Sequence, residues 1–220
     1  MAIVGVSGSP IIDGNTDRMV RALLEQSGKD HIFVNLSTLR YDPCRACAHL
    51  CAKTNLCPLE DDLLPYFEPI LKAEALVLGT PVHSGNITGW MFSFISRLWC
   101  FHHIRNLLRG KPVVLVMTGL VSKSEKDGFD NFKRRLLGGL KRNLHPVNIL
   151  GQIYYASYIP PCYKCGMCKV CKVGGLWFML DCDEEKLKNF KLTSDMFRRW
   201  EDCPHTVARV ETYAKMLSDL

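Results

Sequence analysis

The stretch Gly5-Val6-Ser7-Gly8-Ser9-Pro10-Ile11-Ile12-Asp13-Gly14-Asn15-Thr16 decides the fold of this chain of 220 residues. It follows a short apolar run at residues 2–6 and leads into residues 16–28, where apolar positions recur with helical spacing. Small residues let the backbone approach an anion, and the N-terminus of a helix offers N–H groups and a positive dipole end. The stretch therefore predicts a strand, an anion-binding loop and a helix.

The anion-binding loop contains no lysine or arginine, so neutral donors must hold the ligand. A G-x-x-x-x-G-K-S/T loop is absent from the sequence, which disfavours ATP or GTP as the ligand. The alternative is an ordinary strand-to-helix turn capped by Asn15 or Thr16. The residues expected to contact the anion are Ser7, Ser9, Pro10, Gly14, Asn15 and Thr16.

Four more apolar runs predict strands, at residues 31–36, 75–79, 112–117 and 146–154. Helical patterns separate them at residues 60–72, interrupted near Pro65 or Pro69, at 87–103 and at 127–144. Strands that are continuously apolar and alternate with helices predict a doubly wound α/β fold, a five-stranded parallel sheet covered on both faces. The expected strand order is 2-1-3-4-5, with the ligand above the carboxyl ends of the strands.

Two later loops lie at the same edge of the expected sheet as the anion-binding loop, because each follows a parallel strand. Their backbone donors and flat apolar contacts suit a polyol chain and an aromatic ring system. The residues expected to contribute are Pro81, Val82, His83, Ser84, Gly85, Asn86, Thr118 and Gly119.

The motifs GSP-x3-GNT at residues 8–16 and GTPVHSGNIT at residues 79–88 resemble those of the NADPH-dependent FMN reductase superfamily, within the flavodoxin-like proteins. The resemblance implies a flavodoxin-like fold, FMN as cofactor, NAD(P)H as a possible electron donor, and a homo-oligomer that is a dimer or a tetramer. One departure is His83, where many relatives place an aromatic residue beside the flavin. It could tune the flavin or contact substrate, and a satisfied surface histidine is an equal alternative.

Eight of the eleven cysteines fall into two runs. Four soft thiolates within 14 residues can wrap one [4Fe-4S] cluster, while a structural zinc site and free or disulfide-forming thiols are the alternatives. This first run, with Asp61-Asp62 after it, resembles the iron-sulfur flavoprotein branch of the same superfamily. The branch has two residues between its second and third cysteines, whereas this chain has three, and the resemblance implies as ligands Cys44, Cys47, Cys51 and Cys57.

The second run comprises Cys162, Cys165, Cys168 and Cys171. It approaches the bacterial ferredoxin pattern, which has three residues before its fourth cysteine instead of two. A second [4Fe-4S] cluster and a zinc site both remain open, as does a fourth ligand from Cys182 or Cys203 in place of Cys171.

Domain organisation and composition complete the expectation. We expect a flavodoxin-like domain at residues 1–155 with an insertion at 43–58, and a Cys-rich segment with C-terminal helices near 184–200 and 204–219, packed on the same domain, at 156–220. The net charge is −2 for residues 1–100 and +8 for 101–220, which suits anionic partners, while no nucleic-acid-binding motif accompanies it. Clustered cysteines without a signal peptide or an apolar run of membrane length predict a cytoplasmic protein with no membrane partner.

The predicted function is electron transfer between a two-electron flavin and a one-electron cluster, with a redox partner protein, reduced ferredoxin or a nicotinamide as the other party. The alternatives are an NAD(P)H-dependent flavin or quinone reductase with structural zinc, and a non-catalytic redox sensor or metal-stabilised binding module. No proton-transfer residue can be assigned. Outside the two runs, Cys100 is expected in the core, Arg97 as a basic residue near the flavin loop or a surface ion pair, and Trp90, Trp99 and Phe101 in the core or a subunit interface.

Overall fold

The computed structural model describes residues 2–83, 85–120, 125–157, 167–172, 175–191, 193 and 199–220. Five parallel strands form the sheet, in the order β2-β1-β3-β5-β6. This confirms the expected 2-1-3-4-5 order, and the difference is an additional two-residue strand, β4, which pairs antiparallel with β3. The strands are β1 (Ile3–Ser7), β2 (His31–Asn35), β3 (Leu76–His83), β4 (Asn86–Ile87), β5 (Pro112–Leu120) and β6 (Asn148–Ser157).

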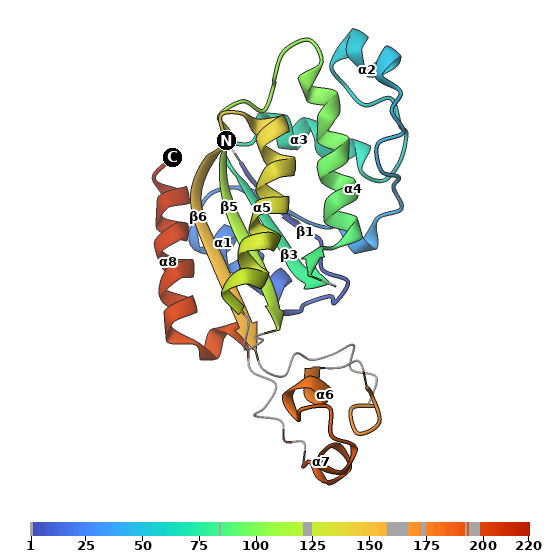
Figure 1. Cartoon of the computed structure of the whole chain (residues 1–220). Coiled ribbons are helices and arrows are strands. Elements are labelled where there is room, and N and C mark those ends of the chain that lie inside the picture. Colours follow the sequence, from blue (N-terminus) through green and yellow to red (C-terminus); the bar gives the residue numbers. More distant parts are fainter. Residues whose placement is uncertain are drawn as a thin grey trace.

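Helices cover both faces of the sheet, as Figure 1 shows. The longer ones are α1 (Asn15–Gln26), α4 (Gly89–Arg97), α5 (Glu125–Leu144) and α8 (Pro204–Ser218). The shorter ones are α2 (Ala48–Thr54), α3 (Phe67–Lys72), α6 (Gly175–Met179) and α7 (Glu184–Asn189), together with the 3-10 turns η1 (Leu36–Thr38), η2 (Leu64–Tyr66), η3 (Leu98–His102) and η5 (Trp200–Asp202).

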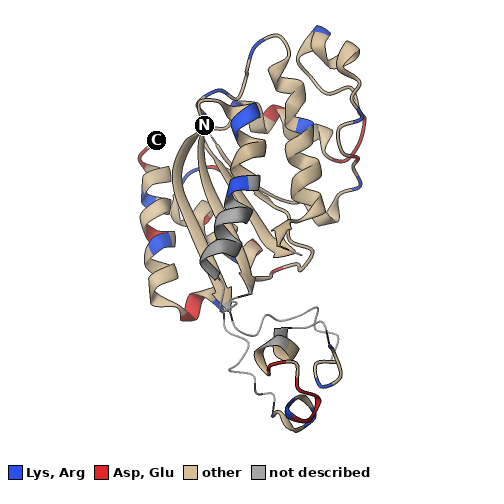
Figure 2. Cartoon of the chain, in the orientation of Figure 1, with Lys and Arg blue, Asp and Glu red and all other residues tan. Residues whose placement is uncertain are grey.

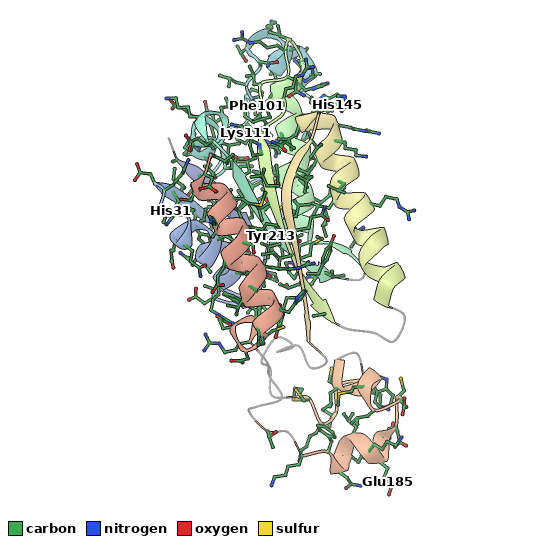
Figure 3. The ribbon with its side chains drawn as sticks, turned by 90° about the vertical axis from the view of Figure 1, so that its left-hand side faces the viewer. His31, Phe101, Lys111, His145, Glu185 and Tyr213 are labelled. Atoms are coloured by element: carbon green, nitrogen blue, oxygen red, sulfur yellow. The ribbon has the colours of Figure 1, made fainter. Side chains whose placement is uncertain are left out.

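The alternation of strand side chains divides the core into two layers. Val4 and Val6 of β1 point to the face that α3, α4 and α5 cover, whereas Ile3 points to the face that α1 and α8 cover. On that second face, Tyr213 of α8 lies against β6, where a Cβ on Gly151 would come within 2.4 Å of its ring (Figure 3). The C-terminal helix α8 is thus part of the same core as the sheet.

Two parts of the molecule lie at opposite ends of the sheet. The strands point toward α6 and α7, which lie beyond the carboxyl edge, while α2 and η3 lie at the other end (Figure 1). In the side view of Figure 3, Phe101 of η3 and Glu185 of α7 accordingly lie far apart. Helices α6 and α7 have a small hydrophobic cluster of their own, centred on Leu176 and Leu187.

Several elements differ from the expectation. The insertion at residues 43–58 contains the helix α2, which the sequence pattern did not predict. Strand β3 includes Pro81, Val82 and His83, and strand β5 includes Thr118 and Gly119. Both strands therefore extend further toward the carboxyl edge of the sheet than the apolar runs that predicted them. The helix expected near 184–200 ends at Asn189 in α7, and part of the remainder lies outside the described residues. Within the described residues, no helix is long and apolar enough to span a membrane.

Candidate functional site

The anion-binding loop connects β1 to α1, and hydrogen bonds anchor it to β3 and to the start of α4. The backbone N–H of Gly8 donates to the carbonyl of Gly79 at 2.8 Å, and the Thr88 hydroxyl donates to the Gly8 carbonyl at 2.8 Å. A Cβ on Gly8 would lie 2.7 Å from Thr88 Oγ1 and 2.9 Å from Met91 Cβ. Glycine is required here because the loop backbone lies directly against the start of α4.

The buried carboxylate of Asp17 fixes the shape of the anion-binding loop by accepting hydrogen bonds. Asp17, in the first turn of α1, accepts hydrogen bonds from the Ser7 hydroxyl at 2.5 Å, from Asn35 Nδ2 at 2.9 Å and from the Asp13 N–H at 3.1 Å. Burial raises the pKa of Asp17, and the hydrogen bonds from Ser7 and Asn35 oppose that shift. Asn35 also donates to the Ser9 carbonyl at 3.1 Å. Asp17 and Asn35 were not predicted as site residues, because neither lies within a recognisable motif.

The N-terminus of α1 carries no side-chain cap. Its N-cap residue is Gly14, and neither Asn15 nor Thr16 caps the helix. Instead, the Thr16 hydroxyl lies 2.7 Å from that of Thr118 on β5, and the Asn15 side chain accepts from Arg18 and from the Trp200 N–H. Capping by Asn15 or Thr16 is therefore wrong. Asp17 is the acidic residue of the first turn, and its carboxylate accepts from Ser7, Asn35 and the Asp13 N–H, while the N-cap position at Gly14 has no side-chain cap.

The hairpin of β3 and β4 borders the same edge. It brings His83 opposite Asn86 and Val82 opposite Ile87, with Gly85 at its tip in the left-handed region, at φ +68°. His83 is half-buried, and burial lowers the pKa of its imidazole, which favours the neutral ring at neutral pH. The structure therefore brings the loops after β1 and β3 and the end of β5 to one edge, while Ser84 lies outside the described residues.

Two exposed cations of α5, Lys141 and Arg142, lie at the opposite end of the sheet from these loops. Arg134, Lys141 and Arg142 are exposed, and the last two occupy the final turn of α5 (Figure 2). The helix runs back from the carboxyl edge of the sheet, so its last turn lies near the amino edge (Figure 1). This position favours a solvated helix face for Lys141 and Arg142 and disfavours contact with a ligand at the carboxyl edge of the sheet.

The first cysteine run lies on the far part of α4. Cys44 is exposed, Cys47 is half-buried, and Cys51 and Cys57 are buried. The backbone N–H of Cys44 donates to Ser96 Oγ at 3.0 Å, which fixes the start of the run to α4. Along α4, the rise from Gly89 to Arg97 is about 12 Å, so the helix separates this run from the anion-binding loop.

The fit of this donor set to an iron-sulfur cluster rests on its chemistry and its crowding. Burial raises the pKa of Cys51, and the neighbouring thiols of Cys47, Cys57 and Cys44 raise it further. Four soft ligands whose negative forms repel one another suit a cationic iron centre. Within the described residues, however, no three His, Cys, Asp or Glu side chains stand close enough to hold a metal ion. Ligation by these four cysteines therefore stays a prediction.

The ends of the cysteine insertion meet at a polar neck. Asp62 accepts from the Arg40 N–H at 2.8 Å, and Asp61 pairs with Arg97 at 2.5 Å. Arg97 is fully buried, so the expectation of a surface ion pair is wrong. At the far end of α2, the Asn55 side chain donates to the Arg105 carbonyl at 2.7 Å.

Cys100 is buried as expected, but it also contacts the cysteine run. A hydrogen bond between the two thiols lowers the pKa of Cys57 against the opposing effect of burial, and Arg97 contributes in the same direction. The same contact and burial raise the pKa of Cys100. Phe101 lies in the core, whereas Trp90 and Trp99 are partly exposed. Sequence spacing did not reveal this contact, because 43 positions separate the two cysteines.

The second cysteine run is only partly described. Cys162 and Cys165 lie outside the described residues, whereas Cys168 and Cys171 are half-buried. Cys168 packs against the small cluster of α6 and α7. The described residues on either side of this segment reach the carboxyl edge of the sheet: Ser157 pairs with Leu120, and the N–H of Trp200 donates to Asn15 at 3.1 Å.

Comparison with known proteins places these features in a family. The chain is 32% identical to an iron-sulfur flavoprotein of Archaeoglobus fulgidus over 136 residues, 60% of this chain and 61% of the relative. It is 30% identical to one of Methanocaldococcus jannaschii over 100 residues, 44% of this chain and 51% of the relative. The chain thus spans about half to three-fifths of the length of these curated relatives.

Solved structures agree on the fold at low sequence identity. An NADH:FMN oxidoreductase in its apo form has a TM-score of 0.53 at 15% identity, over 99% of this chain and 88% of that one. An NAD(P)H:quinone oxidoreductase from Methanothermobacter marburgensis has a TM-score of 0.51 at 15% identity, over 88% and 97%. The family description NADPH-dependent FMN reductase matches residues 1–127, more than half of the sequence. With its strand order and its glycine-rich loop at the uncapped end of α1, the chain belongs to this family.

Proposed function

We propose that this protein is a flavin-dependent oxidoreductase that binds FMN at the carboxyl edge of its sheet and exchanges electrons with a [4Fe-4S] cluster on the first cysteine run. The observation that carries the proposal is the uncapped N-terminus of α1 beneath a loop held by Asp17. The family match and the iron-sulfur flavoprotein names of the relatives support it.

Different segments of this chain bind the phosphate and the ring of the flavin. The loop from Ser7 to Gly14 and the first N–H groups of α1 bind the phosphate, because backbone donors and the helix dipole together stabilise an anion without a lysine or arginine. The hairpin of β3 and β4 and the end of β5 border the ring, and the remaining proposed contacts are those predicted from the sequence at Pro81–Asn86 and Thr118-Gly119. When bound, FMN supplies hydride acceptance and one-electron release.

The cluster is proposed on Cys44, Cys47, Cys51 and Cys57, as thiolate ligands. It supplies a one-electron acceptor or donor that is distant from the flavin loop of the same chain by roughly the length of α4. The exposed apolar side chains of α4, η3 and the following turn, Trp90, Phe92, Trp99 and Ile104, supply a surface for a second copy of the chain. A homo-oligomer would allow a cluster of one chain to approach the flavin of another.

Protein purified without oxygen tests the two cofactors together. We expect flavin absorbance bands with a broad shoulder near roughly 400 nm that bleaches on reduction, and equal amounts of iron and acid-labile sulfide. Zinc without iron or sulfide would support the family reductase with a structural metal instead. Protein with neither metal would leave the flavin reductase alone.

A single substitution separates the two sites. Cys44→Ala should remove the cluster absorbance and leave FMN bound, because Cys44 lies on the far part of α4 from the anion-binding loop. The matched control is Lys53→Ala, an exposed residue of the same insertion, in α2, that is no proposed ligand. Loss of both cofactors in Cys44→Ala, with neither lost in the control, would show that the two sites are not separable.

The electron donor and the second cysteine run are tested in the same preparation. Rapid mixing with NADPH, NADH and reduced ferredoxin, followed at the flavin band, identifies the donor by its rate. A non-catalytic sensor would be reduced by none of the three. For Cys162, Cys165, Cys168 and Cys171 a metal site stays a prediction, and the count of iron and zinc atoms per chain distinguishes a second cluster from a zinc site.

A further inference from the structure

One arginine closes the neck of the cysteine insertion and contacts one of its cysteines. Arg97 Nε donates to Cys57 Sγ at 3.1 Å, and Nη1 donates to the Asp42 carbonyl at 2.9 Å and to Asp61 at 2.5 Å. Weaker contacts join Nη2 to Asp61 at 3.4 Å and to the Leu59 carbonyl at 3.5 Å. The guanidinium therefore holds both the entry and the exit of the insertion.

The planar shape of the guanidinium makes this arrangement specific. Its nitrogens form a rigid fork, so the edge that pairs with Asp61 also fixes where Nε points. Asp61 neutralises the buried positive charge, which leaves the Nε–H as a directed donor to sulfur. Lysine could keep the charge at this position but could not reach the same partners with one ammonium group.

Cys57 differs from the other cysteines of the run in what surrounds its sulfur. Its sulfur accepts the Arg97 Nε–H from α4 at 3.1 Å, and the thiol of Cys100 from η3 lies within hydrogen-bonding reach of the same sulfur. By contrast, the described contacts of the other sulfurs are local: Cys44 Sγ accepts from the Ala46 N–H at 3.4 Å, and Cys51 Sγ lies 3.8 Å from the Ala48 carbonyl. Two donors from outside the insertion thus converge on a single sulfur.

We propose that Arg97 is a positioning residue for the cluster, with Cys100 as the second donor: both hold the Cys57 sulfur in place and stabilise the reduced cluster by hydrogen bonds to that ligand. This inference rests on the proposed cluster at the first cysteine run. Hydrogen bonds to ligand sulfurs are one of the main determinants of iron-sulfur reduction potentials, because they stabilise the added negative charge. Their loss is expected to make the potential more negative.

The experiment measures the midpoint potential of the cluster in the FMN-loaded protein. The low-temperature electron paramagnetic resonance signal of the reduced cluster is followed during a dye-mediated titration, which separates the cluster from flavin absorbance. Arg97→Lys should shift the midpoint to a more negative potential, with about a tenfold smaller reduced-to-oxidised ratio at the wild-type midpoint, or about 59 mV for one electron. Cys100→Ala should shift it in the same direction by less.

Asp61→Asn is the matched control, because it removes the ion pair and keeps the Nε–H. It leaves the positive charge of Arg97 uncompensated beside the cluster, so its midpoint should move to a less negative potential. Opposite signs for Arg97→Lys and Asp61→Asn are therefore expected, whereas simple loosening of the neck would move both in the same direction. A wild-type midpoint in Arg97→Lys, or the same sign in both variants, would overturn the inference.

Two further outcomes remain decisive. If Arg97→Lys does not yield folded protein, Cys100→Ala decides, since an unchanged midpoint there shows that hydrogen bonds to Cys57 do not set the potential. Iron and sulfide analysis of the wild type distinguishes the two proposals. Wild type without a cluster overturns the proposed function and this inference together, whereas a wild-type cluster with an unshifted Arg97→Lys overturns this inference alone.

Discussion

The anion-binding loop and the cysteine insertion both connect a strand to a following helix, yet they are held in different ways. Residues 7–17 are held by their own side chains and by neighbours at the carboxyl edge, with Asp17 at the centre. Residues 42–61 are closed at the neck by Arg97, which comes from a helix outside the insertion. The first loop is therefore organised around a carboxylate of its own segment, whereas the second also needs a side chain from α4.

This difference predicts how each site should respond to substitutions. A loop held by several internal hydrogen bonds keeps its shape when the ligand leaves, which lowers the entropic cost of binding. At the neck of the long insertion, the buried Arg97 binds both the Asp42 carbonyl and the Asp61 carboxylate, so the closure of the neck depends on that side chain. We therefore expect the flavin site to be robust and the cysteine site to be sensitive to changes at Arg97.

The largest expected effect comes from removing Arg97 altogether. Arg97→Met leaves Asp61 without its cation in a nearly buried position, which costs about 3–5 kcal/mol of unfolding free energy when a buried pair is broken. Urea denaturation of the metal-free protein measures this cost, and FMN binding is expected to persist in the molecules that remain folded. A loss of FMN binding free energy as large as the loss of unfolding free energy in Arg97→Met would show that the two sites do not respond separately.

The next largest effect addresses the anion-binding loop. Gly8→Ala places a Cβ 2.7 Å from Thr88 Oγ1, so the loop must move away from α4, at a cost of about 1–3 kcal/mol. We expect a tenfold or greater loss of FMN affinity by fluorescence titration, with iron content unchanged. Gly138→Ala on α5 is the control, because a Cβ there meets nothing within 4 Å. Equal affinity in Gly8→Ala and wild type would show that this close approach does not shape the site.

Removing the central carboxylate sharpens the comparison. Asp17→Ala leaves the Ser7 hydroxyl and the Asn35 amide without their acceptor, which costs about 1–3 kcal/mol for buried donors. FMN binding measured by calorimetry should weaken about tenfold, while the cluster spectrum stays that of the wild type. Asp30→Ala, an exposed acidic residue before β2, serves as the control. A change in the cluster spectrum would mean that the two loops are coupled.

The smallest expected effect is a dependence of stability on pH. Arg18 pairs with Glu201 at 2.6 Å, and although burial opposes the shift, this hydrogen bond helps lower the pKa of Glu201 to about 2. A carboxyl with a lowered pKa adds stability above its unfolded pKa of about 4.3 and loses that contribution as the pH falls toward 2. Between pH 4.5 and 2, the unfolding free energy measured by urea denaturation should fall by about 0.2–1 kcal/mol less in Glu201→Gln than in the wild type. An equally steep loss in the variant would contradict the assignment.

The sequence predicted the sheet and the flavin edge because both depend on local patterns. Continuous apolar runs such as residues 112–117 predict buried strands, and Gly8 and Asn15 lie at fixed positions in a strand-loop-helix unit. The insertion is different. Only Cys51 is buried in the seven residues of α2, so no amphipathic pattern marks that helix. The burial and the contacts of Arg97 were also not predicted, since its partners Cys57 and Asp61 lie 40 and 36 positions away.

The return of the chain to the carboxyl edge at Trp200 has an evolutionary consequence. The backbone leaves the sheet at Ser157 and is held again at Asn15, beside the strands that it left, before α8 packs against α1 and β6. Connections whose ends meet at one edge tolerate the insertion of extra segments, because the core does not depend on their length. We therefore expect the length of the chain between residues 157 and 199 to vary among relatives without loss of the core that β6, α1 and α8 form.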